Sequence, residues 1–318
     1  MTTALRAQPC TTRELIVEQP ALTGTIGIMD SIAAISTIAV PINRWNARLT
    51  LEYARRGPRT AMVRNEHEGP LMVQKALYPE GDDVCQTVIL HPPGGIAGGD
   101  HLSIEVRADD GCVAQLTTPG ATKWYKAHGR DASQDVRLVA NGNAIIEWLP
   151  LENIAFDRCI ARSSLTVELS PHASAAGWDI TAFGRAAAGE RFTDGSYRQA
   201  IEVRRDGSLL WAESGHVRGG DSLLDSPIGF CGRNVSGLLW VCAPEEADEP
   251  TLQACRDVGT QVSGSVLCGV TSLPNGVVLA RCLADSTEAA RLYLTDVWSA
   301  LRPTYAKREA IAPRLWAT

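Results

Sequence analysis

An alternation of apolar and polar residues with a period of two recurs along most of this chain. Residues 48–53 read Arg-Leu-Thr-Leu-Glu-Tyr, and the same pattern returns at 102–107, 165–169 and 201–204. A period of two puts the apolar side chains on one face of an extended strand and the polar ones on the other. The pattern therefore predicts a series of strands, each with one buried face.

Between these segments lie pairs of Asp or Asn followed by Gly, which favour tight turns because both residues tolerate positive φ angles. They occur at Asp110-Gly111, Asn141-Gly142, Asp194-Gly195, Asp206-Gly207 and Asn275-Gly276. Many short strands separated by such turns predict an all-β body whose strands are antiparallel or stacked.

Two segments late in the chain have helical spacing instead, at 251–262 and 286–301. Asp285 or Ser286 can cap the second helix, and Pro303 is expected to end it. The apolar residues at helical spacing in that segment are Ala289, Leu292, Tyr293, Val297 and Leu301.

Further strands are expected between these two helices, at 266–271 and 277–284. From about residue 238 onward the pattern is thus strand, helix, strand, strand, helix. This order predicts a small α+β portion that carries both helices and packs on the β body.

The first part of the chain contains an apolar stretch, 25–40, of the kind found in signal peptides and membrane spans. A membrane-spanning helix needs about 20 apolar residues, whereas this stretch is shorter and contains Asp30. Glu14 and Glu18 precede it, where a signal peptide carries positive charge. We therefore expect an extension or a packed first strand and no membrane contact, with Met29 as an alternative start.

Charge and cysteine content indicate which kinds of partner and which cellular compartment to expect. The net charge is −6, and Lys and Arg are scattered among Asp and Glu, so we expect no nucleic-acid partner, because phosphate binding needs clustered cations. The nine cysteines form no CxC or CxxC pair, which argues against a disulfide framework or a zinc site. The expected compartment is the reducing cytosol.

The most unusual stretch is 91–100, His-Pro-Pro-Gly-Gly-Ile-Ala-Gly-Gly-Asp. Gly94 and Gly99 have the spacing of a phosphate-binding loop, but Asp100 and His101 follow where such a loop carries Lys and Ser or Thr. A carboxylate there would repel phosphate. We expect a rigid loop that lets strands approach closely, with Asp100 capping a turn.

Three carboxylates, Glu147, Asp179 and Glu213, interrupt apolar runs. A carboxylate in such a run is either paired with a hydrogen-bond donor or an Arg, or it faces a hydrated interior. Oxygen and imidazole groups along a water-filled passage can hand on a divalent ion without trapping it, because no single position supplies a full coordination shell. The sequence leaves both readings open.

An enzyme remains an alternative. A sugar- or nucleotide-acting enzyme would pair Asp100 with Glu147 or Glu213 across a cleft of about 5–10 Å. The sequence contains neither a GxSxG nor an HExxH motif, which argues against a serine hydrolase or a zinc protease. A third possibility is a β-rich protein-interaction module without a metal role.

Several motifs occur in a fixed order: Gly69-Pro70-Leu71-Met72-Val73-Gln74, Leu77-Tyr78-Pro79-Glu80-Gly81, the 91–100 loop, Pro119-Gly120-Ala121-Thr122-Lys123-Trp124-Tyr125, Glu147-Trp148-Leu149-Pro150, Phe183-Gly184-Arg185, Ala188-Gly189-Glu190 and Pro313-Arg314-Leu315-Trp316. In this order they resemble the urease accessory proteins of the UreD type, called UreH in some bacteria. The resemblance covers about residues 43–318.

The resemblance implies a mainly β fold with a β-helix-like body of stacked sheets. Together with the strand and helix patterns above, the resemblance divides the chain into an N-terminal extension at 1–42, a β-rich body at 43–237 and the α+β portion at 238–318. It also supports a native start near Met29, because the extension is not covered.

For function, the resemblance implies a non-catalytic assembly factor with no permanent cofactor. Proteins of this type bind apo-urease and recruit a UreF-type accessory protein, which carries the nickel-bearing UreG-type GTPase. Nickel is thought to move through an internal passage. The residues that would line it here are Asp100, Thr122, Asp179 and Glu213, with Glu147 and Glu190 as further candidates and His101 as an adjacent imidazole.

Overall fold

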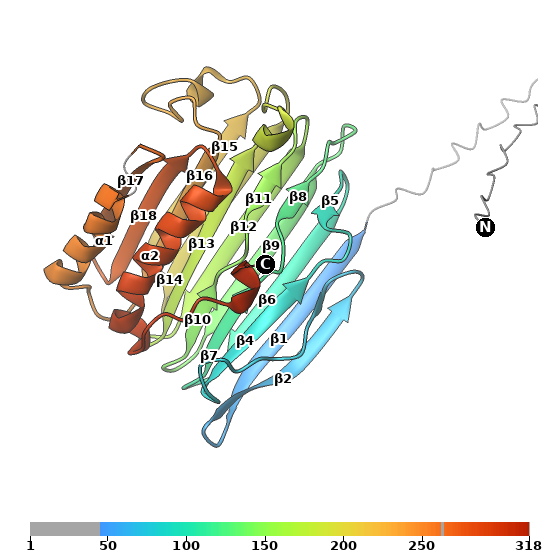
Figure 1. The fold of residues 1–318 in the computed structure, drawn as a ribbon. Helices are drawn as coiled ribbons and strands as arrows, with labels where there is room; N and C mark the ends of the chain where they lie inside the picture. Colours follow the sequence, from blue (N-terminus) through green and yellow to red (C-terminus); the bar gives the residue numbers. More distant parts are fainter. Residues whose placement is uncertain (1–44, 262–263, 318) are drawn as a thin grey trace, which may run out of the picture. The chain divides into compact units, whose positions relative to one another are not determined.

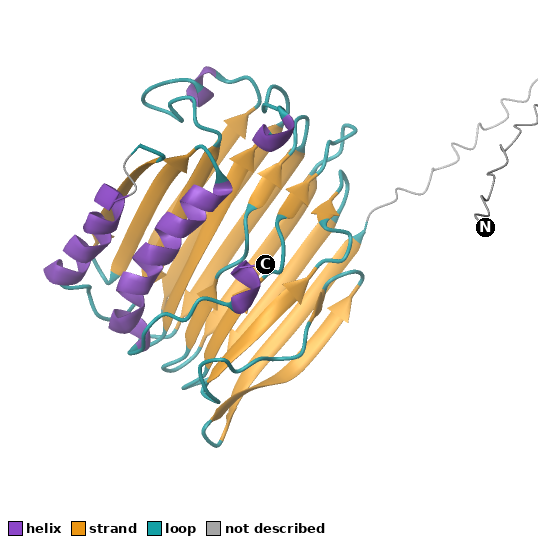
Figure 2. Ribbon diagram, in the orientation of Figure 1, coloured by secondary structure: helices purple, strands orange, loops and turns teal. Residues whose placement is uncertain are grey.

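In the computed structural model, which describes residues 45–261 and 264–317, the chain folds into two stacked β-sheets with two helices on one side (Figures 1 and 2). The expected extension at 1–42 and the alternative start at Met29 lie outside the described residues. Within the described ranges, no helix has both the length and the apolar character needed to cross a bilayer.

The two sheets differ in size. One has seven strands in the order β15 (Ser208–Arg218), β14 (Ser196–Arg205), β12 (Ile160–Leu169), β9 (Ala132–Ala140), β6 (His101–Ala108), β1 (Asn46–Arg56) and β2 (Arg59–Glu68). The other has eleven strands, eight of them along the path β17 (Val266–Leu273), β18 (Val277–Ala284), β16 (Val235–Cys242), β13 (Ser174–Phe183), β10 (Ile145–Trp148), β7 (Val113–Thr117), β4 (Val84–Leu90) and β3 (Met72–Val73). Three short strands lie off this path, β11 (Asn153–Ala155), β8 (Thr122–Trp124) and β5 (Gly95–Ile96). β11 pairs with β13 and with β8, and β8 pairs in turn with β5.

Successive passes of the chain alternate between the two sheets. β6 leads to β7, β9 to β10 and β12 to β13, and each strand runs parallel to its neighbour from the previous pass. Asp110-Gly111 and Asn141-Gly142 turn the chain from one sheet to the other, whereas Asp206-Gly207 and Asn275-Gly276 close the antiparallel hairpins β14–β15 and β17–β18. The expected mainly β, β-helix-like body is confirmed, and its central strands are stacked in parallel.

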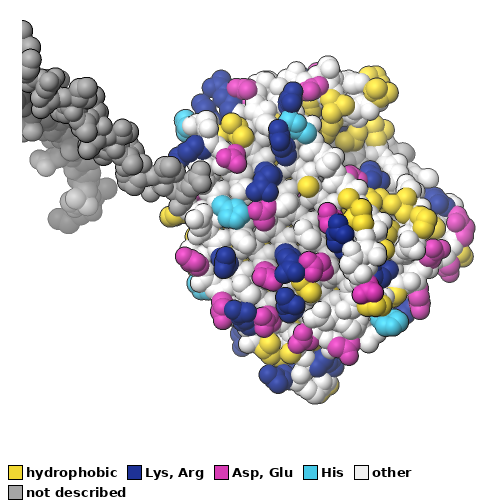
Figure 3. Space-filling view, turned by 180° about the vertical axis from the view of Figure 1, so that it is seen from behind, with side chains coloured by type: hydrophobic (Ala, Val, Ile, Leu, Met, Phe, Trp, Pro, Cys, Tyr) yellow, Lys and Arg dark blue, Asp and Glu magenta, His cyan; other side chains and the backbone are white. Residues whose placement is uncertain are grey.

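The period-two pattern builds the core between the sheets. In β1 and β6, buried residues alternate with more exposed ones, and the buried sets join one apolar cluster. The outward residues of the seven-stranded sheet carry mixed charges (Figure 3). There Arg137 lies 3.0 Å from both Glu105 and Glu168, on the strands to either side. The outer face is therefore a solvated surface on which positive and negative charges alternate.

The two helices cover the outer face of the eleven-stranded sheet and form a second core with it (Figure 2). They are α1 (Glu249–Gln261) and α2 (Thr287–Ala306), and the described short 3-10 turns are η1 (Ala186–Ala188), η2 (Ser222–Leu224) and η3 (Arg314–Ala317). Ser286 caps α2, because its side chain accepts a hydrogen bond from the backbone N–H of Ala289. The predicted order of strand, helix, strand, strand and helix is confirmed.

Two predictions about α2 were wrong. The helix does not end at Pro303 but continues to Ala306. A proline inside a helix costs about 3 kcal/mol, and here the last turn is held because Tyr305 and Ala306 are buried in the second core. Leu292 is 58% exposed, whereas Leu294 and Trp298 are buried. The face of α2 that packs on the sheet therefore includes Leu294 and Trp298, which the predicted spacing left out, and excludes Leu292.

Gly177, in β13, packs against aromatic and backbone atoms that leave no room for a side chain. An ideal Cβ would lie 2.4 Å from Cζ2 of Trp240 and 2.9 Å from the carbonyl oxygen of Trp148. Gly177→Ala is expected to lower the free energy of unfolding by about 1–3 kcal/mol, because overpacking shifts the surrounding backbone. Urea denaturation measures this loss. Gly215→Ala is the control, since its Cβ would meet nothing within 4 Å; equal losses in both variants would contradict the packing argument.

Candidate functional site

The space between the two sheets contains two adjoining cavities, each lined by both apolar and polar side chains. The smaller, of about 30 Å³, is bordered by Thr122, Asp179 and Gln199. The larger, of about 190 Å³, is bordered by Gln199, Glu213 and His216. Gln199 lines both cavities, so they are neighbours. The smaller one has room for about one water molecule. Three of the candidate residues, Thr122, Asp179 and Glu213, therefore line these two neighbouring cavities.

Asp179 supplies the carboxylate of the smaller cavity. Along β13, Trp178 faces the helices, and Asp179 therefore faces the opposite sheet. One carboxylate oxygen accepts a hydrogen bond from the Thr181 hydroxyl (2.7 Å) and the other from the Asn153 amide (3.1 Å). Burial raises the pKa of Asp179, and hydrogen bonds from Thr181 and Gln199 offset part of that rise. No cation contributes to the shift, so this carboxylate is held by neutral groups and can still receive a positive ion.

Glu213 and His216 lie on β15 beside the larger cavity. The Glu213 carboxylate forms an ion pair with Arg281 of β18. Nε2 of His216 lies 2.8 Å from the Ser196 hydroxyl. His216 is exposed, and its pKa is lowered by partial desolvation and by the nearby cations Arg198 and Arg218, which favours the neutral imidazole, the form that binds metal ions.

Asp100 lies at the surface, at the end of the glycine-rich loop. Its carboxylate accepts hydrogen bonds from the backbone N–H groups of Ala97 (3.0 Å) and Trp45 (3.2 Å). It borders an open pocket of about 260 Å³ together with Tyr125. Asp100 thus caps a turn, as the loop sequence suggests, and lies outside both interior cavities.

His101 and Glu190 also lie away from these cavities. His101 begins β6 on its outward face, with Nδ1 2.9 Å from the Ser133 hydroxyl. Glu190 lies 2.6 Å from Arg185, whose guanidinium lowers the pKa of the Glu190 carboxyl. Neither side chain borders the smaller or the larger interior cavity.

Glu147 faces the other side of its sheet, beneath α2. Its neighbours Ile146 and Trp148 point into the core between the sheets, and alternation therefore turns Glu147 toward the helix. Its carboxylate is fully buried and accepts two hydrogen bonds of 3.0 Å from Arg302. It also accepts one of 2.6 Å from the Tyr305 hydroxyl. Glu147 is therefore a carboxylate paired with hydrogen-bond donors and an Arg, and not one that faces a hydrated interior.

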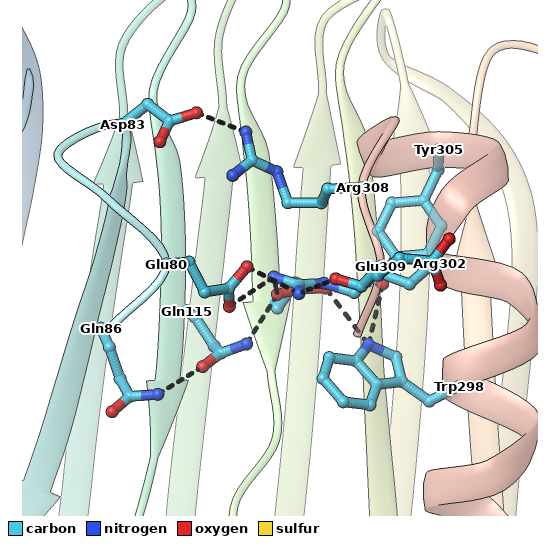
Figure 4. Close-up of polar contacts among 10 residues, drawn as sticks. Glu80, Asp83, Gln86, Gln115, Trp298, Arg302, Tyr305, Arg308 and Glu309 are labelled. Carbon is cyan, nitrogen blue, oxygen red and sulfur yellow. Dashed lines mark hydrogen bonds and ion pairs between the residues drawn. The ribbon is translucent and has the colours of Figure 1, made fainter. Parts of the chain in front are cut away.

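Arg302 connects this carboxylate to a second one. Its two terminal nitrogens lie 2.8 and 2.9 Å from the two carboxylate oxygens of Glu80, which precedes β4. Gln115 of β7 donates a further 2.9 Å hydrogen bond to Glu147 and accepts one of 2.7 Å from Gln86 (Figure 4). The network joins α2 to three strands of the eleven-stranded sheet, and its donors and acceptors are largely matched.

Gln199 and Asn153 also lie at the smaller cavity, although neither was predicted from the sequence to be a site residue. A signal for Gln199 was present, because Tyr197, Gln199 and Ile201 alternate on β14 and the middle residue is polar. No comparable signal marks Asn153, whose place depends on the pairing of the short strand β11 with β13.

The carboxylates that an enzyme would pair do not share a cleft. Asp100 borders the surface pocket, Glu213 the larger interior cavity, and Glu147 is hydrogen-bonded beneath α2. Among residues 45–261 and 264–317, no three side chains of His, Cys, Asp or Glu gather in a way that could hold a metal ion.

Comparison with known proteins relates this chain to one family. The family model described as UreD urease accessory protein matches residues 46–317. Relatives named urease accessory protein UreD include those of Dechloromonas aromatica (47% identity over 276 residues) and Pseudomonas aeruginosa (45% over 274 residues). Each alignment covers 86% of this chain and 95% of the relative. The chain belongs to the UreD family of urease accessory proteins.

Proposed function

We propose that this protein is a non-catalytic cytosolic chaperone for urease maturation. It holds apo-urease together with a UreF-type accessory protein and, through it, a nickel-bearing UreG-type GTPase. Ni²⁺ is its cargo and passes through the cavities between the two sheets. The family assignment supports the maturation role, and the names of the relatives describe accessory proteins and no catalytic activity.

One observation carries the passage part of the proposal: Asp179 is a carboxylate at an interior cavity without a cationic partner. Thr122 borders the same cavity, and Glu213 and His216 border the next one. Such oxygen and imidazole groups, spread along a route, bind a divalent ion weakly at each position and allow it to move on. Asp100 and Glu190 lie at the surface, where they serve as candidate entry or exit groups.

Co-expression tests the maturation role. The urease subunits and the other accessory proteins of the host are expressed with and without this chain, and urease activity and bound nickel are measured. Active, nickel-filled urease is expected only when the chain is present. Equal activity and nickel content without it would contradict the proposal. Co-purification of the chain with urease and the UreF-type protein separates the binding function from nickel transfer.

A further inference from the structure

Two cysteines lie directly opposite each other at the end of the eleven-stranded sheet. In the antiparallel pair β17–β18, Cys268 is the register partner of Cys282. Opposite residues in antiparallel strands have Cα atoms about 4.5–5.5 Å apart, inside the range of about 4.4–6.8 Å that a disulfide spans. Opposite residues also project from the same face, so the two thiols are neighbours.

Packing against the helices confirms that both sulfur atoms lie on the helix side of the sheet. An ideal Cβ on Gly259 of α1 would lie 2.8 Å from Sγ of Cys268. An ideal Cβ on Gly237 would lie 2.6 Å from Sγ of Cys282 and 3.2 Å from Cδ1 of Leu294 in α2. Each sulfur therefore occupies a space left by a glycine, beside the helix layer.

The two thiols differ in access and in reactivity. Cys268 lies on the edge strand and is exposed, whereas Cys282 is 3% exposed. Burial, together with the neighbouring Cys268, raises the pKa of Cys282 to about 12. Because the thiolate is the form that oxidants attack, Cys268 is the first site of oxidation and Cys282 the resolving thiol.

We propose that Cys268 and Cys282 form a peroxide-sensitive dithiol that closes to a disulfide across β17 and β18. In the first step, the Cys268 sulfur attacks one oxygen of hydrogen peroxide, giving a sulfenic acid and releasing water. In the second step, the Cys282 sulfur displaces the sulfenic oxygen, which leaves as a second water molecule with the thiol proton. Two thiols lose two electrons and one peroxide gains them.

Two other cysteines, Cys231 and Cys255, can be compared with the proposed pair. Cys231 is exposed like Cys268, but no cysteine of the described residues is its strand partner. Cys255, one helical turn before Gly259 in α1, is buried and is the third thiol near Tyr293. Cys231 is therefore expected to stop at a sulfur oxyacid, and Cys255 is the nearest competitor for the disulfide.

The test uses the reduced full-length chain treated with hydrogen peroxide. Thiols are counted and the peptides are mapped by mass spectrometry without reduction. We expect one cross-linked peptide pair containing Cys268 and Cys282, with the mass lowered by two hydrogen atoms and restored by dithiothreitol. Cys268→Ser is expected to abolish the cross-link and leave Cys282 reduced, whereas Cys231→Ser leaves the cross-link unchanged.

Three results would overturn the proposal. One is oxidation of Cys268 to a sulfinic acid while Cys282 stays a free thiol. Another is a cross-link from Cys268 to Cys255, and the third is a cross-link between two copies of the chain through Cys268. The mapping is done on the unmodified chain, so a folding defect in a variant cannot obscure the answer. It is also independent of urease, so it can fail or succeed whatever the outcome of the maturation test.

Discussion

Replacing Arg302 with alanine is expected to lower the free energy of unfolding by about 3–5 kcal/mol, because the change leaves buried carboxylates without their cation. Arg302 and Glu147 are fully buried, and the Glu80 side chain is 3% exposed. Thermal and urea denaturation of Arg302→Ala measure the loss, which is expected to appear as well in a larger insoluble fraction on expression.

Two further variants identify the cause. Arg308→Ala removes an ion pair with Asp83 in which the side chains are 25% and 43% exposed, and a change of about 0–1 kcal/mol is expected there. Combining Arg302→Met with Glu147→Gln and Glu80→Gln removes the cation and both charges together and is expected to recover most of the stability. Loss of equal size in the triple variant would mean that shape, and not unpaired charge, makes Arg302 important.

Asp179→Asn is expected to lower urease activation by on the order of 10-fold, the size of effect that loss of a metal-orienting group commonly has. The variant keeps the shape of the side chain and an oxygen that can accept the Thr181 hydrogen bond, but its amide nitrogen replaces the oxygen that accepts the Asn153 hydrogen bond. It removes the one charge that the smaller cavity offers to a passing cation. Urease activity and bound nickel after co-expression measure the effect, with co-purification showing that the partners still bind.

The same substitution is expected to change stability little at pH 7, because removing the ionisation penalty of a buried carboxylate offsets the lost Asn153 hydrogen bond. Burial raises the pKa of Asp179 in the folded chain above its value in the unfolded chain. The folded state therefore disfavours ionisation, and this penalty is present at pH 7. It disappears below the unfolded pKa of about 3.9. The stability of Asp179→Asn relative to the parent should accordingly fall as the pH is lowered toward 4.

The combination of lost activation and retained stability separates a passage residue from a structural one. If Asp179→Asn unfolds more easily at pH 7 and activation falls in proportion, the carboxylate is structural. Unchanged activation would remove Asp179 from the proposed route. Glu168→Gln, which alters a carboxylate on the outer face of the seven-stranded sheet, is the matched control and is expected to change neither quantity.

Much of the secondary structure could be predicted because each signal is local. The period of two located β1, β6, β12 and β14, and helical spacing with the Ser286 cap located α2. The parallel pairing of the central strands could not be predicted from local sequence. An Asp-Gly or Asn-Gly turn has the same sequence whether it closes a hairpin or leads from one sheet to the other. The motif resemblance supplied the β-helix-like body, but not the direction of each strand.

The site was harder to predict for a related reason. Glu147 and Asp179 look alike in the sequence, as single carboxylates within apolar runs. They differ in which face of the eleven-stranded sheet each side chain occupies, and that depends on where α2 packs. The partner of Glu147 is Arg302, 155 residues later, and no short pattern connects the two.

The network beneath α2 also has a consequence for how the chain is made. Arg302 binds Glu80, 222 residues earlier, and all the described strands end by Ala284. During synthesis on the ribosome, both sheets emerge before the cation that two of their carboxylates require. Docking of α2 is therefore a late step, completed only near the end of translation. A chain cut short before Arg302 would retain unpaired acidic groups beneath an incomplete α2, which marks it for removal by proteases.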